Sequence, residues 1–463
     1  MPTVDPLIAT AIALLLAGVW VVWWTRLRDA AGPPLSGSGR AVSWAVVIVY
    51  FTWKTFFYEP REDVLELVNS GMSDSNRIEV AITAASGLWA AWLVVTRRMP
   101  FMSLIQGAGF WIVALVALYS LSALWSVWRD LTLYKSLELA IYWVITAHLF
   151  ATGPWRDTLE RLALWAVIGG LLPPIVQGTG PETGVVARGA VVGAFYSNGS
   201  AMMAGALLLV ALHRLLTRRD LTAKALTLFA VVALLLFHSF TTYLSVVLAL
   251  PALLVLVLVP RATPMATAVM ICGIIGAGVS IAYLAAHAEP HLVEAIGGAA
   301  GKDADQIGSM TGRLPLWEAL WEVSRDKPFG TGFLAMERMI PEIVSQQAVG
   351  WSAAHSHNGF LSAWLAAGFL GIGVLVFFTV ALCIQIVGLD ADARALAIPF
   401  VLFVLVNNMS YPAFGGRLNG AWLMVMGVAF ATSRCRARPV PKAEPSAAAV
   451  RWGGRAAIPH RGG

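Results

Sequence analysis

Long apolar stretches are the feature that most limits what this chain can fold into. Stretches of about 17 or more residues recur along its 463 residues, each long enough to cross the hydrocarbon core of a bilayer as a helix. Only 13% of the residues are charged, against about 25% in soluble domains. In lipid, backbone polar groups must be paired internally, and these stretches lack the polar alternation of barrel strands. The sequence therefore predicts an all-α polytopic integral membrane protein.

The apolar stretches predict about 12 to 13 transmembrane helices with one long polar interruption. The first stretch lacks a preceding basic residue and a small-residue cleavage site, so we expect it to be retained rather than removed as a signal peptide. The predicted spans are 6–25, 41–57, 79–96, 103–124, 134–151, 160–177, 192–213, 222–237, 242–259, 264–286, 366–388, 395–411 and 417–433.

The spans and the interruption divide the chain into four predicted parts. Residues 1–286 form an N-terminal transmembrane bundle, and 287–365 form the long loop that carries the candidate motifs. Residues 366–433 form the C-terminal transmembrane helices, and 434–463 form a basic tail. The tail is rich in Pro, Ala, Gly and Arg without apolar periodicity, so we expect it to be disordered.

Basic residues orient the predicted array. The loops on one side, together with the C-terminal tail, hold 20 Lys and Arg residues, whereas the short loops on the other side hold 7. Basic loops stay in the cytoplasm, so the N-terminus is expected outside and the C-terminus inside. The long loop 287–365 then faces the periplasm or exterior.

The remaining composition narrows the class of protein. The formal net charge of +6 lies largely in the tail and the short loops, so no nucleic-acid partner is expected. The three cysteines, Cys272, Cys383 and Cys435, are scattered, and two of them lie inside apolar spans. Neither a disulfide framework nor a cysteine metal site is predicted.

The long loop contains an amphipathic segment. Residues 312–327 place Leu316, Trp317, Leu320 and Trp321 at helical spacing, and residues 328–332 read Pro-Phe-Gly-Thr-Gly, which ends a helix. Such a helix can lie in the membrane interface or pack on the tops of the spans, and the sequence leaves both alternatives open.

Arg188 and Arg313 both lie in predicted outer loops. Arginine is always charged and grips phosphate with a bidentate fork, so two outer arginines suit a diphosphate. The alternative is that each pairs with a nearby carboxylate or extends to the membrane surface.

Four of the eight histidines lie in the long loop, at His287, His291, His355 and His357. Histidine can take a proton near neutral pH, which makes these residues candidates for a general base. Four imidazoles are also candidate ligands for a zinc ion. We do not predict one, because no cysteine joins them and no His-Glu-x-x-His run is present. No cofactor is predicted either.

Several motifs in fixed order resemble the O-antigen ligase and polymerase family of bacterial membrane glycosyltransferases, over roughly residues 120–375. They are Leu124-Trp125-Ser126 with Lys135-Ser136, Arg188 to Asn198, Gly312-Arg313 with Trp317, 328–332, His357-Asn358 and Gly368 to Gly371. Two places depart from the family pattern. Ser239-Phe240-Thr241 lacks the basic residue that members often carry, and Ala366-Ala367 stands where an acidic residue often precedes the Gly-x-x-Gly.

The resemblance implies a fold and a reaction. The enzyme would be a metal-independent, inverting glycosyltransferase of the GT-C-like type, in the bacterial inner membrane with its site facing the periplasm. It would move a glycan from undecaprenyl diphosphate to a sugar hydroxyl. Arg188, Arg313 and Asn358 would bind substrate, and His357 would deprotonate the acceptor, with His355 as second choice.

The acceptor stays open at this point. A polymerase would take another lipid-linked repeat, in exopolysaccharide or O-antigen synthesis, with a chain-length regulator as a possible partner. A ligase would take lipid A core in lipopolysaccharide synthesis. The motif spacing favours a polymerase slightly. A polysaccharide flippase is the alternative from another class, but the spans carry almost no mid-membrane charge, and transporters tend to bury such charges.

The predicted orientation can be tested with reporter fusions. Because the basic loops favour a cytoplasmic C-terminus, a phosphatase fused there should be inactive and a fluorescent protein fused there should be bright. The reverse pattern would contradict the orientation and would put His357 on the wrong side of the membrane for this reaction.

Overall fold

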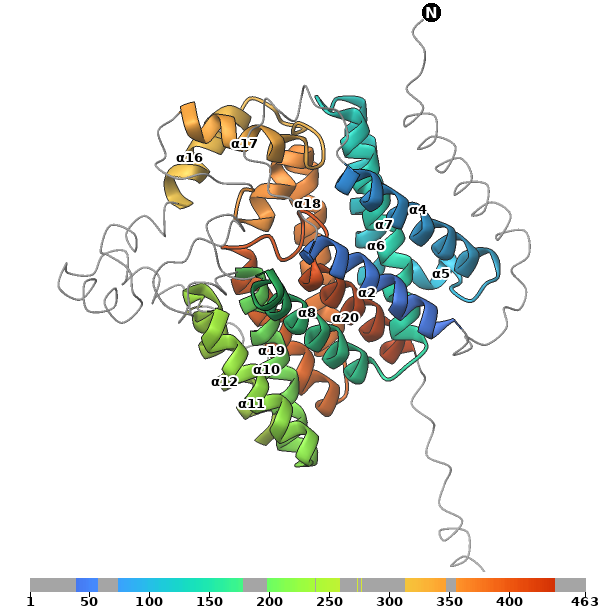
Figure 1. The fold of residues 1–463 in the computed structure, drawn as a ribbon, viewed down its shortest axis with the longest axis vertical. Coiled ribbons are helices and arrows are strands. Elements are labelled where there is room, and N and C mark those ends of the chain that lie inside the picture. Colours follow the sequence, from blue (N-terminus) through green and yellow to red (C-terminus); the bar gives the residue numbers. More distant parts are fainter. Residues whose placement is uncertain are drawn as a thin grey trace, which may run out of the picture.

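The computed structural model describes residues 39–56, 74–177, 198–237, 239–258, 273, 276, 313–346 and 355–437. These residues form helices and connections and contain no strand, which confirms the predicted all-α fold (Figure 1). The predicted span 6–25 and the tail beyond residue 437 lie outside the described residues, as does the predicted span 264–286 apart from residues 273 and 276.

Helices coincide with the other eleven predicted spans. They are α2 (Arg40–Phe56), α4 (Asp74–Val95), α5 (Phe101–Leu104) with α6 (Ala108–Leu121), α7 (Arg129–Ala151), α8 (Trp155–Gln177), α10 (Asn198–Arg218), α11 (Leu221–Phe237), α12 (Phe240–Leu258), α18 (Gly359–Val387), α19 (Ala391–Asn408) and α20 (Gly420–Ala437). Among the described residues, five helical segments are long and apolar enough to cross a membrane: Arg77–Val95, Asn198–Arg218, Phe240–Leu258, Gly359–Val387 and Ala391–Asn408.

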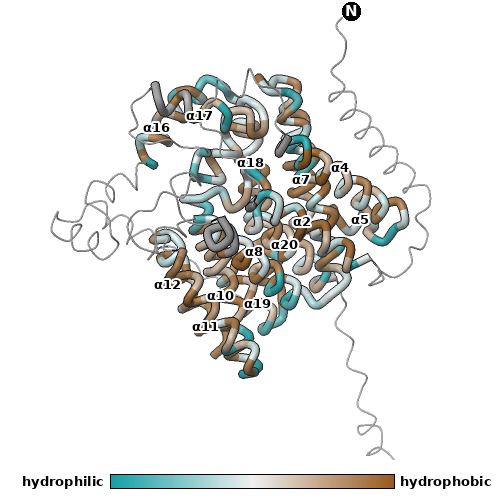
Figure 2. The backbone as a smooth tube through the Cα atoms, in the orientation of Figure 1, coloured by the Kyte–Doolittle hydropathy of each residue, from teal (hydrophilic) through white to brown (hydrophobic). Residues whose placement is uncertain are grey.

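The helices pack into one bundle with a shared apolar core. Near its middle, α20 packs on α7 and α8, while α10 packs on α8, α11, α12 and α19 (Figure 1). The tube in Figure 2 is mostly brown along these helices, with teal gathered at their ends. Trp422, Phe403 and Phe430 are fully buried in this core, which brings sequence-distant helices together.

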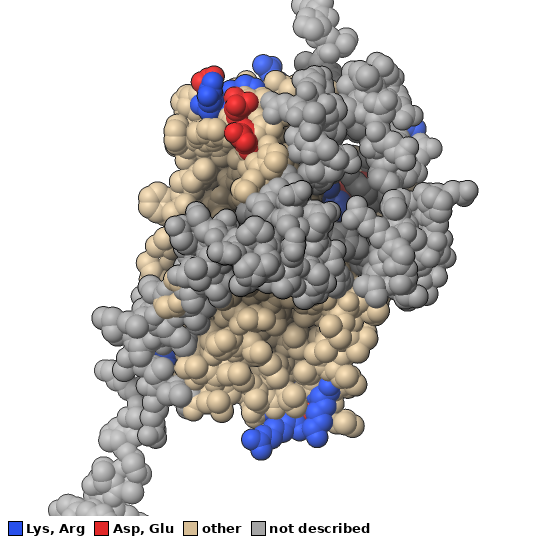
Figure 3. Space-filling view, turned by 90° about the vertical axis from the view of Figure 1, so that its left-hand side faces the viewer, with Lys and Arg blue, Asp and Glu red and all other residues tan. Residues whose placement is uncertain are grey.

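Charged residues gather at the two ends of the bundle. In Figure 3, Lys and Arg lie at the lower end and mixed charges lie at the upper end, and the described surface directly above the lower end is tan. The lower end is tied by ion pairs between helices. Arg214 of α10 pairs with Glu160 of α8 (2.8 Å) and with Asp220 (2.9 Å), and Arg156 pairs with Asp392.

The upper end carries α16 (Arg313–Ser324) and α17 (Ala335–Gln346). The apolar face of α16 packs on protein: Leu316 and Leu320 are fully buried and cluster with residues of α17 and α18. Of the two alternatives for this helix, the structure therefore supports packing on the spans for this face. Trp321 is half exposed and packs against Trp364 of α18 at 5.1 Å between ring centroids.

A break in α18 positions the upper end. Ala367 and Gly368 have non-helical backbone angles, and Gly368 has a φ of +60° and a ψ of −140°. The break leaves two carbonyls for the turn at 328–332. Thr331 N donates to Leu365 O (2.8 Å) and Gly332 N donates to Ala366 O (3.0 Å), while Phe369 N donates to the carbonyl of Pro328 (3.1 Å). The Pro-Phe-Gly-Thr-Gly run and the Gly-x-x-Gly run are thus one joint.

The joint also explains where α18 begins. The predicted span started at residue 366, whereas the helix starts at Gly359, because one further helical segment precedes the break. Hydropathy identifies the apolar part after the break. Similarly, the predicted tail starts at 434, but Arg434 still belongs to α20, which ends at Ala437.

Gly368→Ala tests this joint. A backbone with φ +60° and ψ −140° is open essentially only to glycine, and a Cβ there would collide with the carbonyl of Pro328. We expect a loss of about 1–3 kcal/mol in stability, seen as a lower thermal midpoint of the purified protein.

Gly373→Ala on the same helix is the matched control, since a Cβ at Gly373 meets nothing within 4 Å. It should leave the midpoint unchanged or raise it, because alanine favours helix over glycine. Equal midpoints for the two variants would contradict the importance of the joint.

Candidate functional site at the upper end of the bundle

The His-Ser-His-Asn stretch lies directly before α18. Asn358 is the N-cap of this helix: its Oδ1 accepts hydrogen bonds from Phe360 N (2.9 Å) and Leu361 N (3.1 Å). Asparagine is among the preferred residues at this position because it satisfies the first amide groups of a helix. Its position is therefore explained by helix capping, and the substrate contact predicted for it stays a prediction.

The two histidines of the stretch lie against each other. Their ring centroids are 4.0 Å apart, and His357 N donates to His355 Nδ1 (3.2 Å). His357 has a φ of +55°, a conformation that non-glycine residues adopt rarely and that clusters at functional sites. Tyr411 packs its ring edge-to-face on His355 at 5.5 Å.

Trp317 and Ser356 fix this pair to α16. Trp317 Nε1 donates to Ser356 O (2.8 Å), the carbonyl between the two histidines. The buried Ser356 hydroxyl donates to Asn358 O (2.9 Å) and lies 2.7 Å from the hydroxyl of Ser362. Arg313, one turn before Trp317 on α16, is buried beside the pair. The Arg, Trp and His-Ser-His-Asn motifs therefore act as one unit.

Burial and nearby arginines keep both imidazoles neutral at pH 7. Burial lowers the pKa of His355 well below its ordinary value, and His357, Arg417 and Arg313 lower it further. Burial and Arg313 lower the pKa of His357 to about 4, partly offset by a hydrogen bond to the backbone of Ser410. A neutral imidazole has a lone pair for a proton, although its basicity here is weak.

Arg417 belongs to the site because its charge acts on His355. From the sequence, this residue served only as one of the basic residues that orient the spans. Arg417 lies in the connection between α19 and α20. Hydrogen bonds that hold this connection include those from Tyr119 OH to Gly415 O (2.5 Å) and from Phe414 N to Asn408 Oδ1 (2.9 Å). A single Arg in a short loop forms no recognisable motif. The sequence feature that could have indicated its role is its position directly after Gly415 and Gly416.

The remaining predicted motifs meet at the same end. Trp125 Nε1 donates to Phe329 O (2.8 Å), which ties the connection before α7 to the turn at 328–332. Lys135 joins a buried cluster in which Lys54 and Lys135 each contact the carboxylates of Glu79 and Glu138 at 2.6–3.3 Å.

The segment 239–241, which lacks the family's basic residue, lies among polar side chains. Ser239 Oγ donates to Asn198 Oδ1 (2.9 Å), and Thr242 Oγ1 donates to Asn407 Oδ1 (3.2 Å). These bonds link the upper ends of α10, α12 and α19. Asn198, the last residue of the Arg-led motif and the one member of it that the structure describes, therefore lies beside Ser239.

Arg188, His287 and His291 lie outside the described residues. The predicted pairing of Arg188 with Arg313, and the zinc alternative involving all four histidines, therefore stay predictions. In the described part of the chain, no three His, Cys, Asp or Glu side chains form a group that could hold a metal ion.

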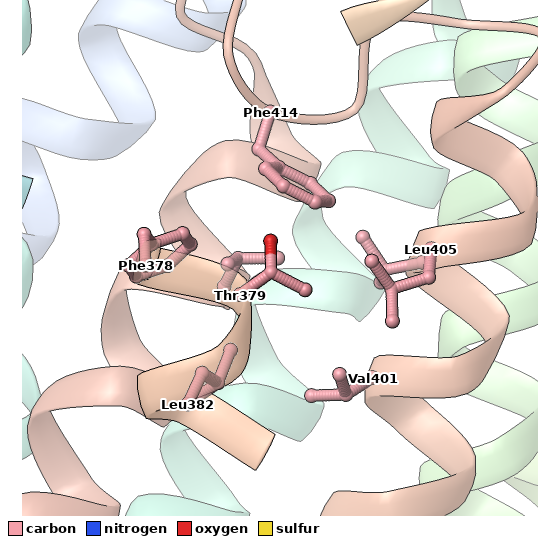
Figure 4. A pocket seen from close by; sticks show the side chains of 8 residues that line it. Phe378, Thr379, Leu382, Val401, Leu405 and Phe414 are labelled. Atoms are coloured by element: carbon pink, nitrogen blue, oxygen red, sulfur yellow. The ribbon is translucent and has the colours of Figure 1, made fainter. Parts of the chain in front are cut away.

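A small cavity lies between α18 and α19, deeper in the bundle (Figure 4). Its walls are apolar side chains, including Phe378, Leu382, Val401 and Phe414, with Thr379 as the one hydroxyl residue. The Thr379 hydroxyl already donates to Leu375 O (2.9 Å). The cavity thus offers no chemistry and is separate from the histidines and arginines.

The fold and the site define a multi-pass helical membrane protein whose polar site is built by connections at one end of the bundle. Residues 225–376 match the family model described as O-antigen ligase. The match contains Arg313, Trp317, both histidines and the joint in α18, and it confirms the predicted O-antigen ligase and polymerase family for this part of the chain. No curated protein matches the chain.

Trp317→Phe tests whether the indole positions the histidines. The change removes the donor to Ser356 O and leaves a buried carbonyl short of a partner, which costs about 1–3 kcal/mol. We expect the transfer reaction proposed below to slow at least tenfold. Trp321→Phe is the control, since Trp321 is half exposed on the same helix. Equal activity of the two variants would contradict the positioning role.

Proposed function

We propose that the protein transfers a glycan from undecaprenyl diphosphate to a sugar hydroxyl at the periplasmic face, by a metal-independent reaction that inverts the anomeric centre. The observation that carries this proposal is the neutral histidine pair beside buried Arg313, within the region that matches the O-antigen ligase family. Neutral bases next to fixed cations suit an anionic leaving group and a hydroxyl nucleophile.

The arginines serve the donor in this proposal. Arg313 and Arg188 grip the diphosphate with bidentate hydrogen bonds and stabilise the charge that grows on it as it leaves. Arg417, whose charge also reaches His355, adds to the positive field at the same end. Asn358 can contact substrate through its amide nitrogen, since its oxygen caps α18.

His357 serves the acceptor. It takes the hydroxyl proton while the acceptor oxygen bonds to the anomeric carbon and the bond from that carbon to the diphosphate oxygen breaks. Attack opposite the leaving group inverts the centre in one step. Donor binding also strengthens this base, because a diphosphate on Arg313 offsets a charge that lowers the pKa of His357. His355 is the second choice for the base.

Two acceptors remain candidates. The motif spacing favours a lipid-linked repeat, hence a polymerase with a chain-length regulator as partner. The description of the matching family, O-antigen ligase, favours lipid A core. Offering the purified protein each acceptor separately, with the same lipid-linked donor, distinguishes them by which product forms.

The reaction can be tested on purified protein with lipid-linked glycan extracted from the source bacterium as donor. His357→Ala should lower transfer by about 10²–10⁴-fold, the usual contribution of a general base, and His355→Ala should lower it less. Arg313→Lys keeps the charge but loses the fork, so it should lose most activity. Arg325→Lys, exposed just after α16, is the matched control and should keep it.

EDTA should leave the wild-type rate unchanged. Full activity of His357→Ala would remove the base assignment, and full activity of Arg313→Lys would remove bidentate diphosphate binding. Loss of activity with EDTA, restored by zinc, would instead support a metal site that includes the histidines.

A further inference from the structure

Glu337 is a buried carboxylate at the upper end of the bundle that the proposed reaction does not use. It lies in the first turn of α17, and both of its oxygens are inaccessible to solvent. Neither oxygen has a hydrogen-bond partner in the part of the chain that the structure describes. Burying a carboxylate in this way costs free energy, so folding alone gives no reason to keep it.

Two cations, Arg417 and Lys135, act on the charge of Glu337, and Lys135 does not depend on Glu337 for its own compensation. Lys135 lies 2.6 Å from Glu79 and 3.2 Å from Glu138, so its charge is already compensated. The charges of Arg417 and Lys135 favour the ionised form of Glu337 only in part. Burial outweighs them and raises the pKa of this carboxyl above its ordinary value.

Glu337 shares its surroundings with the histidine pair. The ionisable groups that face it are Tyr119 from α6, Lys135 from α7, and Tyr411 and Arg417 from the connection between α19 and α20. Tyr411 also packs on His355, and the charge of Arg417 also acts on His355. The carboxylate is therefore part of the site, although no sequence motif pointed to it.

The chemistry of a carboxylate decides which substrate it meets. It repels a diphosphate, whereas its two oxygens accept hydrogen bonds from hydroxyl groups and can receive two adjacent hydroxyls of a sugar ring. We propose that Glu337 binds the acceptor sugar by accepting hydrogen bonds from its hydroxyl groups. This inference rests on the proposed glycan transfer and adds its acceptor side, with the arginines on the donor side.

Steady-state kinetics of Glu337 variants test the inference. The donor is the extracted lipid-linked glycan, and the soluble acceptor is the same glycan freed from its lipid by mild acid, with lipid A core assayed in parallel. For the acceptor that the wild type uses, Glu337→Gln should raise KM by about tenfold. Hydrogen bonds from hydroxyl groups to a charged carboxylate are stronger than those to a neutral amide. Glu337→Ala should raise KM further, and Glu337→Asp should recover part of the loss.

The values of kcat and of KM for the donor should stay within about threefold of wild type. Glu322→Gln, on the exposed face of α16, is the matched control and should change neither constant. An unchanged KM for the acceptor would overturn the inference. A loss of kcat by about 10²-fold or more in Glu337→Gln would overturn it in favour of a general base.

The thermal midpoint without substrate separates binding from a structural role. Since burial raises the pKa of Glu337, its charged form opposes folding above the ordinary carboxyl pKa of about 4.3. Glu337→Gln should therefore equal or exceed the wild-type midpoint at pH 7, with any gain shrinking toward pH 4. A lower midpoint would mark a structural residue and overturn the inference. Absence of any transfer by the wild type would instead overturn the proposed function.

Discussion

The pairing between the turn at 328–332 and the broken backbone of α18 is the constraint on which the upper end depends. A continuous α18 would use the carbonyls of Leu365 and Ala366 within the helix, and the turn would lose both acceptors. In an apolar setting no water is available to replace these hydrogen bonds. This turn also holds the connection before α7, because Trp125 Nε1 donates a hydrogen bond to Phe329 O. The glycines of both motifs are therefore required by backbone geometry, whatever substrate the site binds.

Charge at the upper end is divided between compensated and uncompensated groups. Lys54, Lys135, Glu79 and Glu138 neutralise one another and fasten α2, α4 and α7. Such a buried cluster is stable only because every member has partners. The charge of Lys135 also acts on Glu337, yet neither carboxylate oxygen of Glu337 has a hydrogen-bond partner in the described residues. The paired cluster therefore stabilises the fold, whereas Glu337, within the described part of the chain, has the free acceptor oxygens that the proposed sugar contact requires.

Sequence patterns predicted the apolar helices and the motifs that follow one another in a fixed order along the chain. Apolar length predicted the helices. The order of Arg313, Trp317 and the stretch 355–358 predicted a group of residues in which Trp317 donates a hydrogen bond to Ser356. Arg417 and Glu337 escaped because a single charged residue in a short loop or an amphipathic helix looks like a solvated one. The environment of Glu337 depends on the packing of α17 on α7 and α18, which no local pattern encodes. The start of α18 was misplaced for a related reason: hydropathy does not register a capping asparagine.

The electrostatics of the site imply an order of binding for the proposed reaction. Before any substrate is present, Arg313 and Arg417 lower the pKa of the histidines, so the site holds positive charge and weak bases. The diphosphate of the donor is attracted to that field, whereas the acceptor hydroxyl itself carries no charge and gains nothing from it. Once the diphosphate compensates Arg313, the same charge no longer opposes protonation of His357, and the base strengthens. An acceptor that arrives first meets a base too weak to help it, so the hydroxyl is activated only when a donor is in place to receive its attack.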